Sequence, residues 1–94
     1  MDAVEARAVL AEALARYRSR SYEELAGRIG EIDASEVVGP SGAAYQIEIE
    51  IRWDDRPGGD VLVLGGIDDG GWRSSFSPLN SSFIIAQDGS FVGE

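Results

Sequence analysis

The segment YQIEIEIRW, residues 45–53, alternates apolar and polar side chains along its whole length. Its apolar members are Tyr45, Ile47, Ile49, Ile51 and Trp53, and its polar members are Gln46, Glu48, Glu50 and Arg52. A period of two residues is that of a β-strand with one face on a core and the other in water. The segment therefore predicts a sheet whose apolar face another element must cover.

The covering element is expected upstream, where residues 3–19 follow a helical period. Apolar residues recur on one side of the helix, and they are Ala3, Ala6, Leu10, Ala13, Leu14 and Tyr17. Glu5, Glu12 and Arg16 are expected on the opposite, solvent-facing side. Because the apolar stripe is rich in alanine, the helix should lie close to the sheet.

A second helical segment follows at residues 21–29. Ser21 and Glu24 have the spacing of a capping box, and Gly30 suits a left-handed C-terminal cap. Since the two segments are separated by a break in the period, we expect one bent or two-part helical region over residues 3–29.

The remaining chain has strand and turn signals. Residues 31–38 are a strand candidate, and GPSG at 39–42 is typical of a hairpin turn. DDRPGG at 54–59 supplies the next turn. DVLVLGGI at 60–67 is apolar at both alternating sets of positions, which predicts a central strand.

The sequence then predicts two further turns. DDGG at 68–71 has the composition of a hairpin turn, and an alternating fourth strand is expected over 72–76, with Pro78 ending it. Asp88-Gly89 indicates a type I′ turn between two short hydrophobic arms. The prediction is a single α+β domain over 1–94, with a four- to five-stranded antiparallel sheet over 31–92.

Composition excludes several chemistries. The 94 residues contain no cysteine, histidine or lysine. Disulfides, thiolate and imidazole catalysis and lysine Schiff bases are therefore ruled out. We expect no catalytic residue, no cofactor-binding residue and no cofactor, and we regard enzymatic activity as the less favoured class.

Two acidic turns could each form a functional site, which would be an alternative to a non-catalytic protein. Asp68 and Asp69, flanked by glycines, could ligate a hard cation such as calcium, but the next acid is Asp88 and no bidentate glutamate follows at a suitable spacing. The aspartates of 54–60 could form a carboxylate pair for acid–base work. Solvated turn residues are the favoured interpretation of both groups, so no metal site is predicted.

The net charge is −9, from 17 acidic and 8 basic residues. Such a surface repels nucleic acid and anionic membranes, and it favours a basic protein partner or serves solubility. The candidate interaction face consists of Glu48, Glu50, Arg52, Asp68 and Asp69. No apolar run approaches the roughly 20 residues of a membrane span, and no hydrophobic signal core is present, so a cytoplasmic location is expected.

Two stretches carry a resemblance. WDDRPGGDVLVLGGIDDGGW and the tail WRSSFSPLNSSFIIAQDGSFVGE, roughly the C-terminal half of this chain, resemble the ending of small uncharacterised bacterial proteins. The layout of one helix followed by antiparallel strands is similar to cystatin-like folds. That resemblance implies a curved sheet wrapped around a helix, and it transfers no activity.

Three functions stay open at this point. The favoured one is a non-catalytic protein that binds a partner through an acidic surface. The second is a small enzyme or ligand-binding domain with a pocket between helix and sheet, and the third is a homodimerisation module that associates through its sheet.

Overall fold

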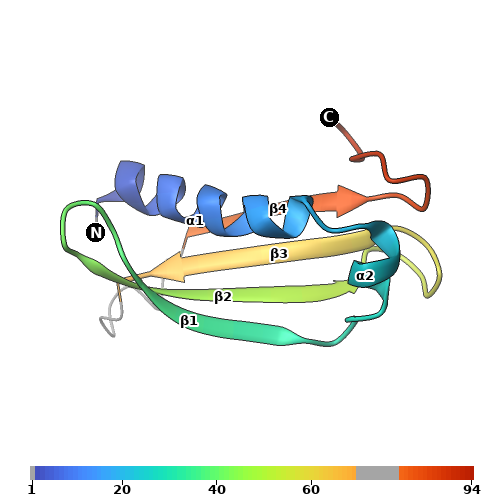
Figure 1. The fold of residues 1–94 in the computed structure, drawn as a ribbon, viewed down its shortest axis with the longest axis horizontal. Coiled ribbons are helices and arrows are strands. Elements are labelled where there is room, and N and C mark those ends of the chain that lie inside the picture. The colour runs from blue at the N-terminus through green and yellow to red at the C-terminus, as the bar shows by residue number, and fades with distance from the viewer. Residues whose placement is uncertain (1, 70–78) are drawn as a thin grey trace.

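The structure is a computed structural model that describes residues 2–69 and 79–94. The chain order is α1 (Ala3–Arg18), α2 (Tyr22–Ala26), β1 (Ile32–Val38), β2 (Ala44–Trp53), β3 (Val61–Asp68) and β4 (Leu79–Ile85). The strands form one antiparallel sheet in the order β1-β2-β3-β4, and α1 lies along one face of it (Figure 1). The α+β prediction is confirmed, and the described residues contain four strands.

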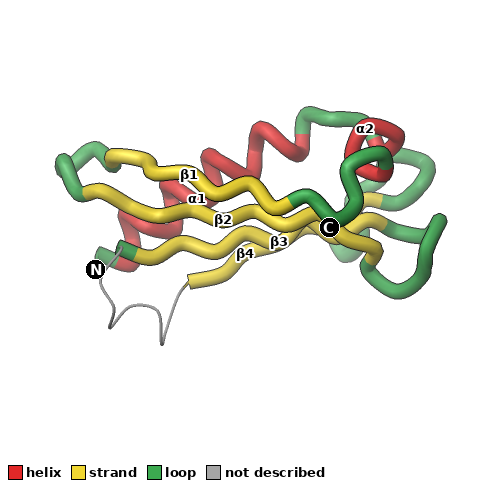
Figure 2. Tube along the Cα trace, turned by 90° about the horizontal axis from the view of Figure 1, so that it is seen from below, coloured by secondary structure: helices red, strands yellow, loops and turns green. Residues whose placement is uncertain are grey.

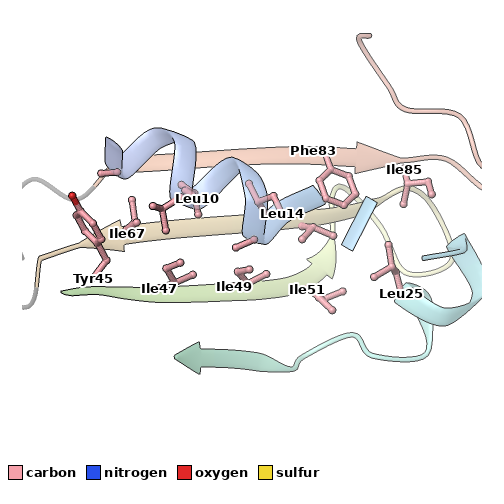
Figure 3. Packing of buried hydrophobic residues seen from close by; sticks show 14 of the residues in the cluster. Leu10, Leu14, Leu25, Tyr45, Ile47, Ile49, Ile51, Ile67, Phe83 and Ile85 are labelled. Carbon is pink, nitrogen blue, oxygen red and sulfur yellow. The ribbon is translucent and has the colours of Figure 1, made fainter. Parts of the chain in front are cut away.

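Helix α1 packs on the sheet through the alanine-rich stripe. Its buried residues are Ala6, Val9, Leu10, Ala13 and Leu14. Leu10 and Leu14 lie over Gly65 of β3 and share one buried cluster with Ile47, Ile49 and Ile67 (Figure 3). Val9 was not in the predicted stripe, whereas Ala3 and Tyr17 were predicted and are only half-buried.

The helical region has two parts, as predicted. Asp2 caps α1 by accepting hydrogen bonds from the backbone of Val4 and Glu5 at 3.0 and 3.1 Å. Ser21 caps α2 through a 3.1 Å bond from the Glu24 backbone. Helix α2 is shorter than predicted, because it ends at Ala26, and the left-handed Gly30 (φ 94°) belongs to the turn that leads into β1.

The alternation of β2 is confirmed. Tyr45, Ile47, Ile49 and Ile51 are buried and Trp53 is half-buried, while the polar residues between them face away from α1. β3 occupies the predicted central position between β2 and β4. Register joins the strands into rows, such as Ile47↔Ile67↔Leu79.

The turns that contain Gly42 and Gly89 have the same backbone geometry. The backbone amides of Gly42 and Gly89 each donate to the carbonyl three residues earlier, at 2.9 Å, and both glycines have positive φ (91° and 87°). A type I turn followed by a glycine bulge has this pattern. The type I′ prediction for Asp88-Gly89 is wrong, because it requires positive φ at Asp88 and no described non-glycine residue has one.

The fourth strand of the described chain is Leu79–Ile85. The predicted strand over 72–76, Pro78 and the second half of the 68–71 turn lie outside the described residues. After the Asp88 turn, Phe91 forms a single bridge to Ile85, so the last hydrophobic arm is no strand.

A contact between distant segments ties α1 to the residues after β4. Arg18 donates from both Nη atoms to the Glu94 carboxylate at 2.7 and 2.8 Å. Its guanidinium carbon also lies 4.8 Å from the Phe83 ring centroid and 4.9 Å from that of Phe91. The C-terminal end of α1 is thereby held beside β4.

Candidate interaction surface

The sheet has one face that α1 does not cover. Within the four strands, odd-numbered residues face α1 and even-numbered residues face the other way, because register keeps each row on one side. We call the even-numbered side the open face. All of its residues are exposed or half-buried, and α1 passes behind the strands when the sheet is viewed from this side (Figure 2).

The open face gathers most of the predicted interaction residues. Glu48, Glu50 and Arg52 follow one another along β2, and Asp68 ends β3 on the same side. Asp69 lies one residue beyond the strand, so it is not part of the ladder. The prediction missed Glu36 of β1, which joins this face because its register partner is Gln46.

Charge on the open face is mainly negative. Its strands carry the carboxylates of Glu36, Glu48, Glu50 and Asp68 against the single guanidinium of Arg52. Gln46 donates from Nε2 to Glu36 Oε2 at 2.9 Å, and Arg52 Nη1 lies 4.0 Å from Glu50 Oε1. The first contact links Glu36 of β1 to β2, and the second lies within β2.

A shallow hollow lies in the middle of this face, over Gly66. Its volume is about 280 Å³, and its lining includes Ala34, Gln46, Glu48, Gly66, Asp68 and Asn80. The hollow exists because Gly66 has no side chain, and a Cβ there would lie 3.2 Å from Asn80 Oδ1. Carboxylate and amide oxygens around it suit the donors of a guanidinium or ammonium group.

A second depression runs between α1 and β1. It has a volume of about 330 Å³, and Val9, Glu12, Ala13, Arg16, Val37 and Ile47 contribute to its walls. This is where a pocket between helix and sheet was expected. No charged side chain is buried in the described part of the chain, so this depression offers no buried carboxylate for acid–base chemistry.

Glu5 forms a hydrogen-bonded cluster that the sequence did not reveal. Its carboxylate accepts bonds from the Tyr45 hydroxyl at 2.6 Å, the Ser41 hydroxyl at 2.7 Å and the Ser41 backbone at 2.8 Å. The expectation that Glu5 faces solvent is therefore wrong. A signal was present, since Glu5 precedes the buried Val9 by four residues and so flanks the packed side of α1.

Hydrogen bonding within the cluster moves the pKa values of Glu5 and Tyr45 away from neutrality. The Tyr45 hydroxyl, followed by Ser41, lowers the pKa of Glu5. The hydrogen bond to Glu5, followed by burial, raises the pKa of Tyr45 to about 12. A carboxyl with a lowered pKa and a phenol with a raised one exchange no proton near pH 7, so the cluster anchors the β1–β2 hairpin to α1.

The structure describes the acidic turn after β2 in full, whereas of the predicted 68–71 turn it describes only Asp68, which ends β3, and Asp69. The Asp54 amide donates to the Asp60 carbonyl at 2.9 Å, which closes the β2–β3 hairpin. Among the described residues no three or more His, Cys, Asp or Glu side chains are grouped to hold a metal ion. No helix in residues 2–69 or 79–94 is long and apolar enough to cross a membrane.

No protein-family model, curated protein or solved structure matches the chain. The open face is therefore the feature from which a function can be inferred, since it combines an uncovered sheet surface with a concentration of carboxylates.

Proposed function

We propose that this protein acts by association and that its open face binds a basic protein partner without catalysis. The observation that carries the proposal is the single-sided cover of the sheet: α1 packs on one face only and leaves Glu48 and Glu50 in the middle of the other. A negative face set between apolar side chains is the arrangement that steers a positively charged partner into register.

The acidic and the apolar residues of the open face contribute differently to binding. Exposed ion pairs contribute only about 0–1 kcal/mol each, so the carboxylates alone give little affinity. Leu62, Leu64 and Ile84 lie half-buried beside them on β3 and β4. Burying such apolar area adds about 25 cal/mol per Å², so the apolar residues supply affinity while the carboxylates set the association rate and its salt dependence.

The proposed setting is the cytoplasm of a bacterium. The resemblance of residues 53–94 to small uncharacterised bacterial proteins supports the bacterial source, and the absence of cysteine suits a reducing compartment. The small-enzyme alternative has weaker support, because the residue types for common catalysis are missing and the Glu5 and Tyr45 pKa values lie away from neutrality.

The test compares two double variants that remove the same charge. Glu48→Gln/Glu50→Gln changes the open face, and Glu12→Gln/Glu23→Gln changes exposed acids on the helices. We expect a basic partner to associate with the wild type and the helix variant faster at low salt than at high salt, and the open-face variant to lose most of this salt-dependent gain. Equal loss from both variants, or no salt-sensitive partner at all, would contradict the proposal.

A further inference from the structure

Strand β1 leaves one edge of the sheet uncovered. Among the described residues β1 pairs with β2 alone. Its helix-facing residues Asp33 and Ser35 are exposed, so β1 extends beyond the cover of α1, as the separation of β1 from α1 in Figure 1 also shows. No strand of the described chain therefore covers the outer side of β1.

Hydrogen bonds identify which backbone groups face outward. Ile51 N donates to Glu31 O at 3.1 Å, and Gly39 N donates to Ala43 O at 2.8 Å. In an antiparallel ladder, bonded pairs recur every second residue, so Asp33, Ser35 and Val37 exchange their bonds with β2. The N–H and C=O groups of the even-numbered residues, from Ile32 to Val38, consequently point away from the sheet.

Side chains on this edge are unusually apolar for a solvent-exposed strand. Ile32 is 59% exposed and Val38 is 65% exposed, and they are two of the four large apolar side chains that stand exposed in the described chain. The carboxylates of the strand are turned inward: Asp33 accepts from the Tyr17 hydroxyl and Glu36 accepts from Gln46, each at 2.9 Å. Neither acid shields the edge in the way natural edge strands use outward charges.

The opposite edge of the sheet, formed by β4, is partly covered by the chain that follows it. Val92 N donates to the Ile84 carbonyl at 2.9 Å, and Phe91 bridges to Ile85, so the segment after β4 covers that end of the strand. The outward residues that precede them, Asn80 and Ser82, have polar side chains. Of the two edge strands, β1 is therefore better suited than β4 to pair with an added strand.

We propose that a second copy of this chain occupies the β1 edge. The two β1 strands pair antiparallel about a two-fold axis at Ser35, with Ile32 of one copy opposite Val38 of the other and Ala34 opposite Glu36. This register engages all four outward-facing residues and joins the two exposed apolar side chains. A shift by two residues either opposes Glu36 to Glu36, which like charges disfavour, or leaves Val38 without a partner.

The dimer should be weak and should strengthen with salt. A strand of seven residues spans roughly 23 Å, and a contact confined to its edge buries less than the about 1,200 Å² of a standard interface. Each copy carries a net charge of −9, so the copies repel one another until salt screens them. Binding of a basic partner has the opposite salt dependence, so the two proposals can fail separately.

Disulfide trapping tests the register directly, because the chain has no cysteine of its own. In the proposed dimer Ser35 faces itself in a pair without hydrogen bonds, where Cα atoms are about 4.5 Å apart and a disulfide can close. Two cysteine variants serve as controls. Ala34→Cys lies next to Ser35 on the same strand but faces Glu36 in the proposed dimer, and Ala15→Cys on the exposed side of α1 measures the rate of random collision.

We expect Ser35→Cys to form covalent dimers on the order of tenfold faster than both controls, since effective concentrations inside a complex reach the millimolar range. Its rate should rise with salt. Equal rates for the three variants, faster trapping at position 34, or a rate that falls with salt would overturn the proposal. So would a wild type that sediments as a monomer at every concentration in high salt, which would leave the edge to a different protein.

A proline variant tests whether the backbone edge is used. Ala34→Pro removes an outward N–H and leaves every β1–β2 bond in place. In the Ser35→Cys background it should lower trapping to the rate of Ala15→Cys, provided that a cooperative melt shows the variant to be folded. Unchanged trapping in a folded variant would contradict edge pairing.

Discussion

Gly65 is the position where a single methyl group should test the packing of α1 on the sheet. An added Cβ would lie 2.9 Å from Leu10 Cδ1 and 3.2 Å from Leu14 Cδ2. Both leucines are buried, at 1% and 4% exposure, so neither can swing into solvent. In Gly65→Ala the helix must therefore move away from β3 or the leucines must leave their preferred rotamers.

The expected cost follows from two opposing effects. Overpacking a close-packed core costs about 1–3 kcal/mol. Replacing glycine by alanine restricts the unfolded chain and stabilises by about 0.4–1 kcal/mol, and Gly65 has no positive φ that alanine would strain. The net expectation for Gly65→Ala is a loss of about 0.5–2 kcal/mol, or roughly 2–16 °C in Tm for a domain of this size.

The neighbouring glycine provides the control. Gly66 lies on the open face, where an added Cβ meets Asn80 Oδ1 at 3.2 Å, and that side chain is exposed and free to turn. We expect Gly66→Ala to melt at or slightly above the wild-type temperature, measured by circular dichroism with urea denaturation as a second assay. In a Leu10→Ala background the cost of Gly65→Ala should shrink, because the closest contact is gone.

Two outcomes would refute this reasoning. If Gly65→Ala is as stable as the wild type, α1 does not lie on β3 at the distance described. If Gly66→Ala is the more destabilised variant, the two faces of the strand are reversed.

Three further predictions concern other parts of the fold. Ile49→Asp should abolish the cooperative thermal transition, because it places an unpaired charge in the core, and a melt near the wild-type midpoint would contradict the assigned face of β2. Tm should be constant between about pH 5 and pH 9. It should fall at low pH, since the pKa values of Glu5, Asp88 and Glu94 are lowered and their stabilisation disappears as the carboxylates are protonated. It should fall again above pH 10, since the pKa of Tyr45 is raised from 10.0 to about 12 and burial also raises the pKa of Tyr17, so Tyr45→Phe should show a smaller alkaline decline than the wild type. Arg18→Lys should melt below the wild type although the charge is kept, because lysine cannot make the bidentate contact with Glu94 or stack on the rings, and an unchanged melt would show that the contact adds no stability.

Local patterns in the sequence were sufficient for most of the architecture. The alternation of residues 45–53 assigned both faces of β2, and the doubly apolar run at 60–67 placed β3 in the centre, because both signals arise within one strand. Only the end of the β4 segment LNSSFII was recognised, as the hydrophobic arm before Asp88, because only Phe83 and Ile85 among its residues are buried. Its assignment required pairing with β3, which is a long-range property.

The interaction surface was predictable only along a single strand. Glu48, Glu50 and Arg52 share a face because of their spacing in β2. Glu36 joins them only through the register between β1 and β2, which no local pattern specifies. The same limit explains Glu5: its partners lie 36 and 40 residues away, across a turn whose orientation depends on the assembled sheet.

The order of the elements along the chain has a consequence for synthesis on the ribosome. Each of the four described strands pairs with its neighbour in sequence, so each pair can form as soon as its second strand emerges. Helix α1 is translated before β3 and β4, and residues 19–60 take roughly 2–8 s to make at ordinary elongation rates. During that interval β3, which Leu10 and Leu14 contact at Gly65, has not been made, so these side chains are exposed to chaperones and aggregation until the third strand arrives.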